Sequence, residues 1–407
     1  MRKRHDGGEE ELKKILSLVL CLAMLFTAAA AETVLNGGEN RGIVIDKAYE
    51  NDPISGYSPT TGLALSDVAA QAPEGFAGLA VTGRYMPILV QIDNADGGIG
   101  FKDGKVTYNR APWGVKYADV VYETPLYREG QTRLTFLFSD LLPDAVGPCR
   151  SARLFHAWLR EEWDCGFAFY GQQEYTATNG PAEFKIYGAD VKADGMLLFA
   201  GTVGSNHPWK QYYTAYSKAN GKKVDLTKPH HISANLAAMV SLIPYDFEAA
   251  NHTWLFTDEL PEEGDDAEAI YVTWARGDLA IYNSLLEWDE DEECYYRYMS
   301  DKKGSYNNVY KNLRYEGEED VKFNNVIIQF TDMEWARVDA PNPTVLGTGN
   351  ADYFMGGKHL TGVWNRDTMS ERTVFYDENG EEIRLQRGRT LIVVMDYQSE
   401  NRQVSYE

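Results

Sequence analysis

Short, continuous apolar runs separated by polar turns set the pattern of the chain from residue 86 onward. Runs of this kind, rich in β-branched and aromatic residues, predict strands with both faces buried; they occupy residues 86–92, 119–122, 134–138 and 165–170. Between the last two runs, Leu154, Trp158 and Trp163 form one apolar stripe, which predicts a helix over 151–163. The order strand, loop, helix, strand is typical of an α/β or α+β domain.

The pattern changes near residue 269, where short strands recur without an intervening helix. The predicted strands cover residues 270–274, 293–299, 325–330, 351–355, 359–364, 373–376 and 391–395. Gly356-Gly357 and Asn379-Gly380 stand where hairpin turns belong. The predicted fold class is therefore α+β: an N-terminal mixed α/β sandwich-like domain followed by a β-rich C-terminal domain.

Composition divides the chain further. Residues 32–84 are rich in Gly, Pro, Ser, Thr and Asn and show little periodicity, which predicts a flexible tether. The N-terminal domain is expected over 85–250 and the C-terminal domain over 265–400, with a charged link between them. A second irregular stretch, residues 171–231, is long enough to suggest a functional or covering loop region.

The first 31 residues are typical of a signal peptide. Lys13 and Lys14 precede an apolar run that ends in small residues at Ala29 and Ala31, so cleavage is expected after Ala31. An uncleaved membrane anchor is the alternative, because 17 apolar residues are just enough to span a bilayer. Cys21 lacks the small residue that a lipoprotein signal places before its cysteine. The expected location is extracellular or in the cell envelope.

Charge and cysteine content narrow the functional classes. Without residues 1–31 the chain carries 34 Lys and Arg against 57 Asp and Glu, a net charge of −23 compared with −22 for the full sequence. Such a charge repels nucleic acid and anionic lipid. The membrane is therefore expected as a partner only through an uncleaved leader. Cys149, Cys165 and Cys294 are expected to be buried thiols without a disulfide.

Motifs for cofactor, metal or covalent chemistry are weak. The glycine cluster at residues 97–100 precedes a predicted strand instead of a helix, which argues against a dinucleotide site. The histidines, including the adjacent His230 and His231, lack metal-ligand spacing, and residues 289–293 and 377–379 lack the ligand order of a calcium loop. No Gly-x-Ser-x-Gly motif occurs. We expect no cofactor and no metal, and interpret the acidic segments as solvated turns.

The run from Gly147 to Arg153 carries two guanidinium groups at the predicted start of a helix. That position already has the positive end of the helix dipole, so cations there require a negative partner. Asp93 and Glu123 each end a predicted strand, and Arg133 lies in a loop before another. The sequence predicts that Asp93, Glu123, Arg133, Arg150 and Arg153 meet at one ligand-binding site.

These residues belong to a set of motifs that resembles a known family, the YerB-like lipoproteins of the bacterial envelope. The motifs are Ser58–Leu63, Pro87–Asn94, Ala118–Glu123, Gly130–Arg133 and Gly147–Arg153, followed by Asn325–Gln329 and Gly362–Trp364. The resemblance spans residues 58–397 and implies an N-terminal α/β domain, a β-rich C-terminal domain and an envelope location, with no assigned reaction. The chain departs from the family pattern in lacking a lipobox and in reading Gly171-Gln172-Gln173 after the strand at 165–170.

Two interpretations of the charged residues remain open at this point. The five residues either form a pocket for an anionic or sugar-like ligand, or form a buried ion network that fixes the domain core. A high aromatic content, with Tyr212, Tyr213 and Tyr216 beside Trp209, suits either a glycan ligand or core packing. The predicted function is non-catalytic binding or scaffolding of an anionic or glycan cell-wall ligand or of an envelope protein.

The alternative function is a hydrolase acting on cell-wall material. Glycoside hydrolysis needs two carboxylates about 5–10 Å apart, and Asp93 and Glu123 are the candidates. Neighbouring arginines would lower the pKa of both carboxyl groups, which suits hydrogen-bond acceptors better than a general acid. Catalysis is therefore the less favoured interpretation.

Overall fold

The computed structural model describes residues 32–46, 52–94, 112–170, 232–243, 245–250, 252–301, 303–306 and 321–407, with short pieces of strand in between. Several sequence-based predictions lie outside this part of the chain. They are the signal peptide at 1–31, the Gly171-Gln172-Gln173 departure, the side chains of Trp209, Tyr213 and Tyr216, and the His230-His231 pair.

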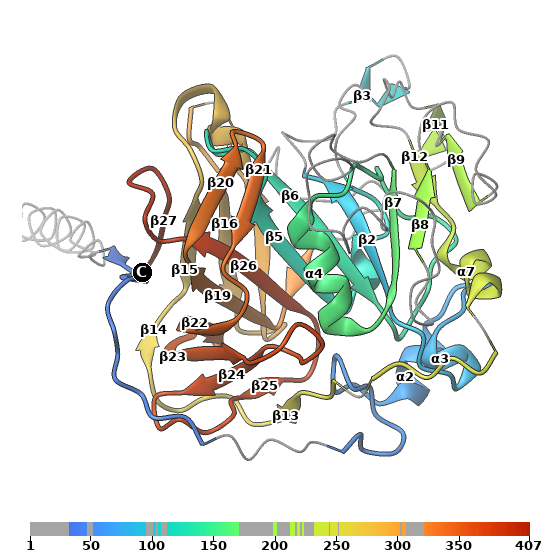
Figure 1. Ribbon diagram of the computed structural model, residues 1–407, viewed down its shortest axis with the longest axis horizontal. Coiled ribbons are helices and arrows are strands. Elements are labelled where there is room, and N and C mark those ends of the chain that lie inside the picture. The colour runs from blue at the N-terminus through green and yellow to red at the C-terminus, as the bar shows by residue number, and fades with distance from the viewer. Residues whose placement is uncertain are drawn as a thin grey trace, which may run out of the picture.

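One large mixed sheet of 11 strands runs through both halves of the molecule (Figure 1). In spatial order its strands are β14 (Asp265–Asp266), β23 (Lys358–Arg366), β22 (Gly347–Met355), β19 (Asn325–Thr331), β26 (Thr390–Asp396), β5 (Val120–Pro125), β6 (Thr132–Phe138), β2 (Ile88–Asp93), β7 (Gly166–Tyr170) and β8 (Leu198–Gly201), with β24 (Val374–Asp377) beside β23. The two halves join where β5 pairs with β26 in parallel, with Val121 opposite Leu391.

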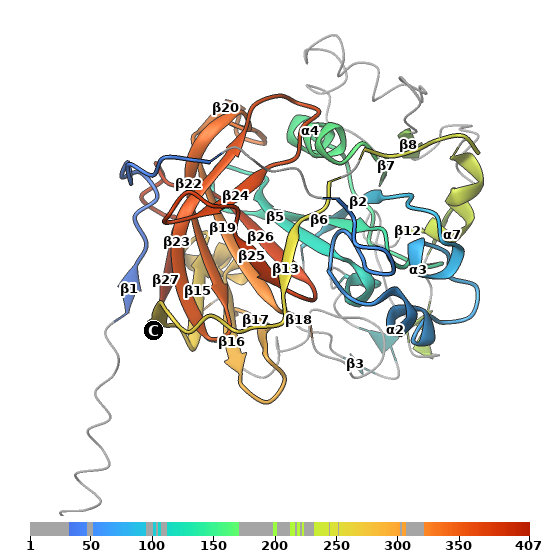
Figure 2. The same cartoon turned by 90° about the horizontal axis from the view of Figure 1, so that it is seen from below.

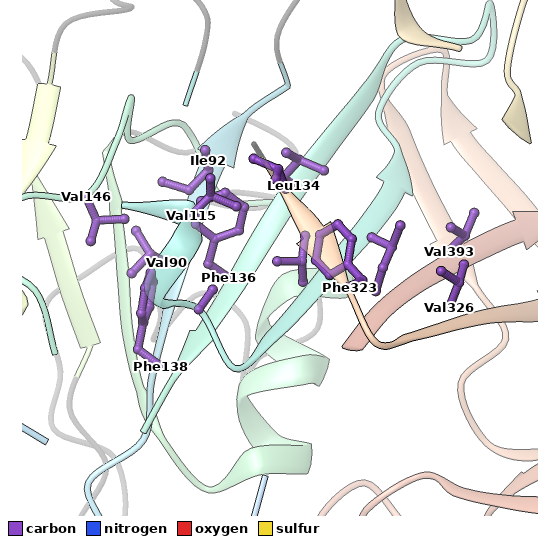
Figure 3. Packing of buried hydrophobic residues seen from close by; sticks show 14 of the residues in the cluster. Val90, Ile92, Val115, Leu134, Phe136, Phe138, Val146, Phe323, Val326 and Val393 are labelled. Atoms are coloured by element: carbon purple, nitrogen blue, oxygen red, sulfur yellow. The ribbon is translucent and has the colours of Figure 1, made fainter. Parts of the chain in front are cut away.

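A second sheet of six antiparallel strands covers one face of the large sheet. Its order is β1 (Thr33–Val34), β27 (Gln403–Tyr406), β15 (Ala269–Thr273), β16 (Ser284–Asp289), β17 (Cys294–Met299) and β18 (Lys322–Phe323). Ile270 and Leu286 of this sheet share a core with Val326 and Val393 of the large sheet. Figure 3 shows this core continuing into the N-terminal half, where Val90 and Phe136 lie side by side.

Helix α4 (Leu154–Trp163) lies against the opposite face of the N-terminal strands (Figures 1 and 2). Leu154, Phe155 and Trp163 pack there with Leu89 and Leu137 in a second core. Because side chains alternate across a strand, neighbouring residues of β2, β5 and β6 contribute to different cores. This alternation decides which charged residues can meet.

Shorter elements complete the fold. The short helices are α2 (Leu65–Ala70), α3 (Leu79–Thr82) and α7 (Leu236–Met239), and the 3₁₀ turns are η1 (Val115–Tyr117), η3 (Val240–Leu242) and η4 (Gly277–Tyr282). Five pairs of short strands are β3 (Phe101–Lys102) with β4 (Lys105–Val106), β9 (Tyr213–Ala215) with β12 (Ile232–Ala234), β10 (Lys218–Ala219) with β11 (Lys222–Lys223), β13 (Leu255–Thr257) with β25 (Arg384–Gln386), and β20 (Met333–Arg337) with β21 (Ala340–Pro343).

The fold class predicted from the sequence is confirmed: a mixed sheet with a helix in the N-terminal half, and antiparallel β-rich structure in the C-terminal half. The helix begins at Leu154, three residues later than the predicted residue 151, because residues 147–152 run as extended chain beside β2. The positions of the domain boundaries stay a prediction.

Residues 33–46, which we call the strap, lie within the segment predicted as a tether. The strap makes specific contacts with the C-terminal half: Arg41 donates to the carbonyl oxygens of Ala351 and Gly362 at 2.7 and 2.9 Å and pairs with Asp352 at 2.7 Å. These contacts use main-chain carbonyls and one arginine, so hydrophobic periodicity does not reveal them. Flexibility of the remaining segment stays a prediction.

Cys149, Cys165 and Cys294 are buried, as predicted, and each is a free thiol. Burial raises the pKa of the Cys149 and Cys165 thiols far above the usual value. Within the described residues, no helix has both the length and the apolar character required to cross a bilayer.

Candidate functional site

The segment from Gly147 to Arg153 is held as extended chain at the end of β2. Cys149 bridges to Ile92, and the Arg150 N–H donates to the carbonyl of Gln91 at 2.9 Å. Gly147 is needed for this path, because a Cβ there would lie 2.3 Å from the ring of Trp113. The segment therefore delivers its arginines to the place where β2 ends.

Helix α4 begins directly after Arg153. The Arg153 backbone N–H donates to Nδ1 of His156 at 2.9 Å, so the imidazole caps the first turn as a neutral acceptor. Burial, together with the charges of Arg133 and Arg153, holds the pKa of His156 well below its usual value. His156 therefore serves to orient the chain and adds no positive charge to the site.

Three predicted residues, Arg133, Arg150 and Arg153, form one group that we call the arginine cluster. Arg150 Nη1 lies 2.7 Å from Asp93 Oδ2, and Arg133 stands directly opposite Asp93 in the β2–β6 pair. Arg133 and Arg153 donate to the same acceptor, the Ser151 carbonyl, at 3.1 and 3.3 Å. Sharing one acceptor brings two guanidinium groups close together.

Burial and mutual repulsion disfavour the charged forms of the arginines in the cluster. Burial, with contributions from Arg153 and Arg150, lowers the pKa of Arg133 to about 9, although Asp93 acts in the opposite direction. Burial also lowers the pKa of Arg153, against the attraction of Asp339. Arg133 is 3 % exposed, and its Nε has no hydrogen-bond partner among the described residues. An anion placed here would relieve the repulsion and complete the hydrogen bonding.

Glu123 does not join the arginine cluster, contrary to the prediction from the sequence. It stands opposite Leu134 in the β5–β6 pair, which turns its side chain to the face of the sheet away from α4. There Glu123 Oε2 lies 2.6 Å from Arg297 Nη2 of β17, and both side chains are fully buried. Oε1 accepts hydrogen bonds from Asn94 and Thr132 at 3.0 and 2.9 Å.

This separation removes the geometric basis for a carboxylate pair acting in hydrolysis. Asp93 and Glu123 lie on opposite faces of one sheet, and each forms an ion pair with a different arginine. A glycosidase pair must instead flank a single bond of the substrate. The two acids therefore act as partners of cations.

A buried polar cluster that the sequence analysis did not identify lies beneath the Ser58–Leu63 turn. Asp119 Oδ2 accepts from the hydroxyls of Thr60 and Ser139 at 3.0 and 2.6 Å, and Asp140 Oδ2 accepts from Thr61 at 2.7 Å. Burial and the neighbouring Asp140 charge raise the pKa of Asp119 well above its usual value. These hydrogen bonds connect the turn to the end of β6. In the sequence, only the hydroxyl-rich motif Ser58–Leu63 indicated that such a cluster could form.

The acidic segments considered for calcium form ordinary turns. Asp289 accepts from the backbone N–H of Glu292 at 2.9 Å, and Asp377 accepts from the N–H groups of Asn379 and Glu381 at 2.9 and 3.0 Å. Within the part of the chain that the structure describes, no group of three or more His, Cys, Asp or Glu side chains could hold a metal ion.

Comparison with known protein families identifies both halves of the chain. Residues 78–223 match the N-terminal domain, and residues 270–392 the C-terminal domain, of a family described as protein of unknown function (DUF3048). The chain therefore belongs to this family. No curated protein matches the sequence.

A solved structure is similar over most of the chain. It is the crystal structure of the YerB protein from Bacillus subtilis, which is 17 % identical and aligns with a TM-score of 0.57 over 86 % of this chain and 99 % of that one. At this identity the similarity shows the fold alone. The resemblance to YerB-like proteins read from the sequence is confirmed.

Proposed function

We propose that this DUF3048-family chain is an exported protein of the bacterial cell envelope that binds an anionic group and does not transform it chemically. Export rests on the basic and apolar leader of residues 1–31 and its small residues at the expected cleavage position. A binding role rests on the arginine cluster, which no described carboxylate pair or nucleophile accompanies in the geometry of a catalytic site.

A single observation carries the proposal: three guanidinium groups converge at the start of α4, and the Nε of Arg133 has no hydrogen-bond partner among the described residues. Among the described residues, Asp93 is the carboxylate that forms an ion pair within the cluster. Arg150 remains 18 % exposed, so one member of the cluster is accessible from solvent. Several donors on rigid elements can bind one phosphate or carboxylate group by charge-assisted hydrogen bonds.

The remainder of the molecule constrains the ligand. A net charge of −22 repels anions at long range, so affinity must come from short-range contacts within the cluster. An anionic group displayed on a cell-wall glycan or on an envelope protein meets this condition, because its carrier can add contacts outside the cluster.

Inorganic phosphate and the variant Arg150→Gln test anion binding at the cluster. A ligand present at 100 times its Kd stabilises the folded state by about 2.7 kcal/mol, so saturating phosphate is expected to raise the Tm of the unmodified chain. Arg150→Gln is expected to abolish most of that rise while keeping the fold. The control is Arg276→Gln, an exposed arginine outside the cluster with the same change of charge.

The results separate a binding site from a purely structural ion network. A Tm rise that Arg150→Gln removes and Arg276→Gln preserves supports the binding site. If phosphate leaves the Tm unchanged while Arg150→Gln lowers it strongly, the arginines only stabilise the fold and the proposal fails.

Export is tested separately by fractionating cells that produce the full chain. The protein is expected in the envelope or medium, with Glu32 as its first residue after N-terminal sequencing. Full-length chain confined to the cytoplasm would contradict this part of the proposal.

A further inference from the structure

A cavity of about 240 Å³ lies between the Ser58–Leu63 turn and the paired strands β13 and β25, and no residue of the arginine cluster lines it. Figures 1 and 2 both show β13 beside β25, and the register places Leu255 opposite Arg384. Gly62 allows the turn to approach β13 closely, because a Cβ at this position would lie 2.4 Å from the ring of Phe256. The cavity is thus built from elements of both halves of the chain.

Two residues of the lining, Trp254 and Arg384, carry hydrogen-bond donors that have no acceptor among the described residues, although the indole N–H of Trp254 is itself covered by protein atoms. Trp254 is 4 % exposed, and its Nε1 has no hydrogen-bond partner among the described residues. A buried indole N–H normally has an acceptor. Its ring is fixed by edge contacts with Trp163 and Phe375, at 5.4 and 6.4 Å between centroids.

The second donor is Arg384, which is exposed and has no ion pair in the described part of the chain. The neighbouring Arg387 differs, because it pairs with Asp258 at 2.7 Å and also donates to the Gly62 carbonyl. Arg387 therefore holds the wall in place, whereas the guanidinium of Arg384 is available to a ligand.

The rest of the lining is largely apolar and partly exposed. Ile54 is 63 % exposed and Tyr57 is 40 % exposed, and both face the cavity together with Leu255 and Phe256. Asp52 also lines the cavity, and its carboxylate would repel a second negative charge on a ligand. The cavity is smaller than the pockets that bind drug-sized molecules, which occupy about 300–1,000 Å³.

We infer that this cavity binds a small monocarboxylate with an apolar body. The carboxylate would accept hydrogen bonds from Arg384, and the apolar body would pack on the side chains of Ile54, Tyr57 and Phe256, with Trp254 as part of the wall. A dicarboxylate is disfavoured by Asp52. This site is distinct from the arginine cluster, since α4 separates Trp163 from Arg153 by about 15 Å.

Phenylacetate is a suitable probe, because it combines one carboxylate with one aromatic ring. Isothermal titration of the full chain is expected to give a Kd of about 1 mM, which is ordinary for a ligand of this size. Arg384→Gln is expected to weaken binding about 10- to 100-fold, the loss typical of a hydrogen bond to a charged group. Trp254→Phe, which keeps an aromatic ring in the wall and removes an N–H that the ligand does not reach, is expected to leave the Kd nearly unchanged.

Matched controls separate this site from general effects of charge. Arg276→Gln removes the same charge at an exposed position outside both sites and is expected to leave phenylacetate affinity unchanged. Phenylacetamide, the neutral analogue, is expected to bind weakly and to be indifferent to Arg384→Gln. Since Arg384 is exposed, its variant tests the site even if Trp254→Phe disturbs the core.

Three results would overturn the inference. They are the absence of saturable phenylacetate binding to the unmodified chain, unchanged affinity in Arg384→Gln, and an equal loss in Arg150→Gln. The last result would assign carboxylate binding to the arginine cluster, which leaves the proposed function intact while removing this second site.

Discussion

The fully buried ion pair between Glu123 and Arg297 gives the sharpest test of how the two halves are held together. Nη2 of Arg297 lies 2.6 Å from Oε2 of Glu123, and neither side chain is exposed. Arg297→Met fills a similar volume and leaves the Glu123 carboxylate buried without a cation. Breaking a buried pair in this way costs about 3–5 kcal/mol of the free energy of unfolding, which is a large fraction of the stability of an ordinary domain.

The loss should depend on pH. Burial raises the pKa of Glu123, and Arg297 acts in the opposite direction, so replacing Arg297 raises this pKa further. Between the ordinary glutamate pKa of about 4.3 and the raised folded value, the folded state holds more protons than the unfolded state. The free energy of unfolding therefore falls as pH rises through this interval. Arg297→Met is expected to be more destabilising at about pH 7.5 than at about pH 5.

A double variant separates the loss of the pair from the loss of packing. Glu123→Gln combined with Arg297→Met removes both charges, while the new amide oxygen can still accept from Asn94 and Thr132. Two further donors of Arg297, Nε and Nη1, have no partner among the described residues, so the native pair is imperfectly satisfied. The double variant is therefore expected to recover at least half of the lost stability.

Urea denaturation at the two pH values, with Arg276→Met as an exposed control, measures these effects. The reasoning is refuted if Arg297→Met is as stable as the unmodified chain. It is also refuted if its loss is the same at both pH values, or if the double variant is less stable than Arg297→Met alone.

Three further predictions follow from contacts elsewhere. Trp163→Phe removes the 2.8 Å hydrogen bond to the Tyr122 hydroxyl in the second core and should cost about 1–3 kcal/mol in urea denaturation; an unchanged midpoint would contradict it. Arg41→Ala removes three contacts of the strap and should expose that segment to proteolysis before the remainder of the chain, whereas equal cleavage rates would argue against docking. Cys149 and Cys165 should resist iodoacetamide in the folded chain at about pH 8, because burial raises their pKa and blocks access; mass spectrometry should find labelling only after denaturation.

Much of the fold could be predicted from the sequence, because strands buried on both faces read as continuous apolar runs. Residues 134–138 and 325–330 were predicted as strands and form parts of β6 and β19. Strands β20 and β21 escaped prediction, since their nine residues include two prolines and few consecutive apolar side chains. Local sequence also contains no signal for strand partners. The pairing of β5 with β26 joins residues about 270 positions apart.

The candidate site was predicted in part. The spacing of Arg150 and Arg153 before an apolar stripe indicated the entrance of a helix, where Arg153 is the N-cap residue, and Asp93 forms an ion pair with Arg150. Glu123 was misplaced because the ends of two strands were assumed to present side chains to the same face. The face follows from the register of each strand with its neighbour, and only the assembled sheet fixes that register.

Alternation across one sheet therefore divides the charged residues into two arrangements with different capacities. On the face away from α4, Glu123 and Arg297 are fully enclosed and neutralise each other, so a ligand has no access to them. On the α4 face, Arg133 and Arg153 share the Ser151 carbonyl, the donor Nε of Arg133 has no described partner, and the cluster reaches solvent. Removing a cation from the first arrangement should cost stability, whereas adding an anion to the second should increase it. The opposite signs of these two responses, measured on one folded chain, distinguish structural charge pairing from ligand binding.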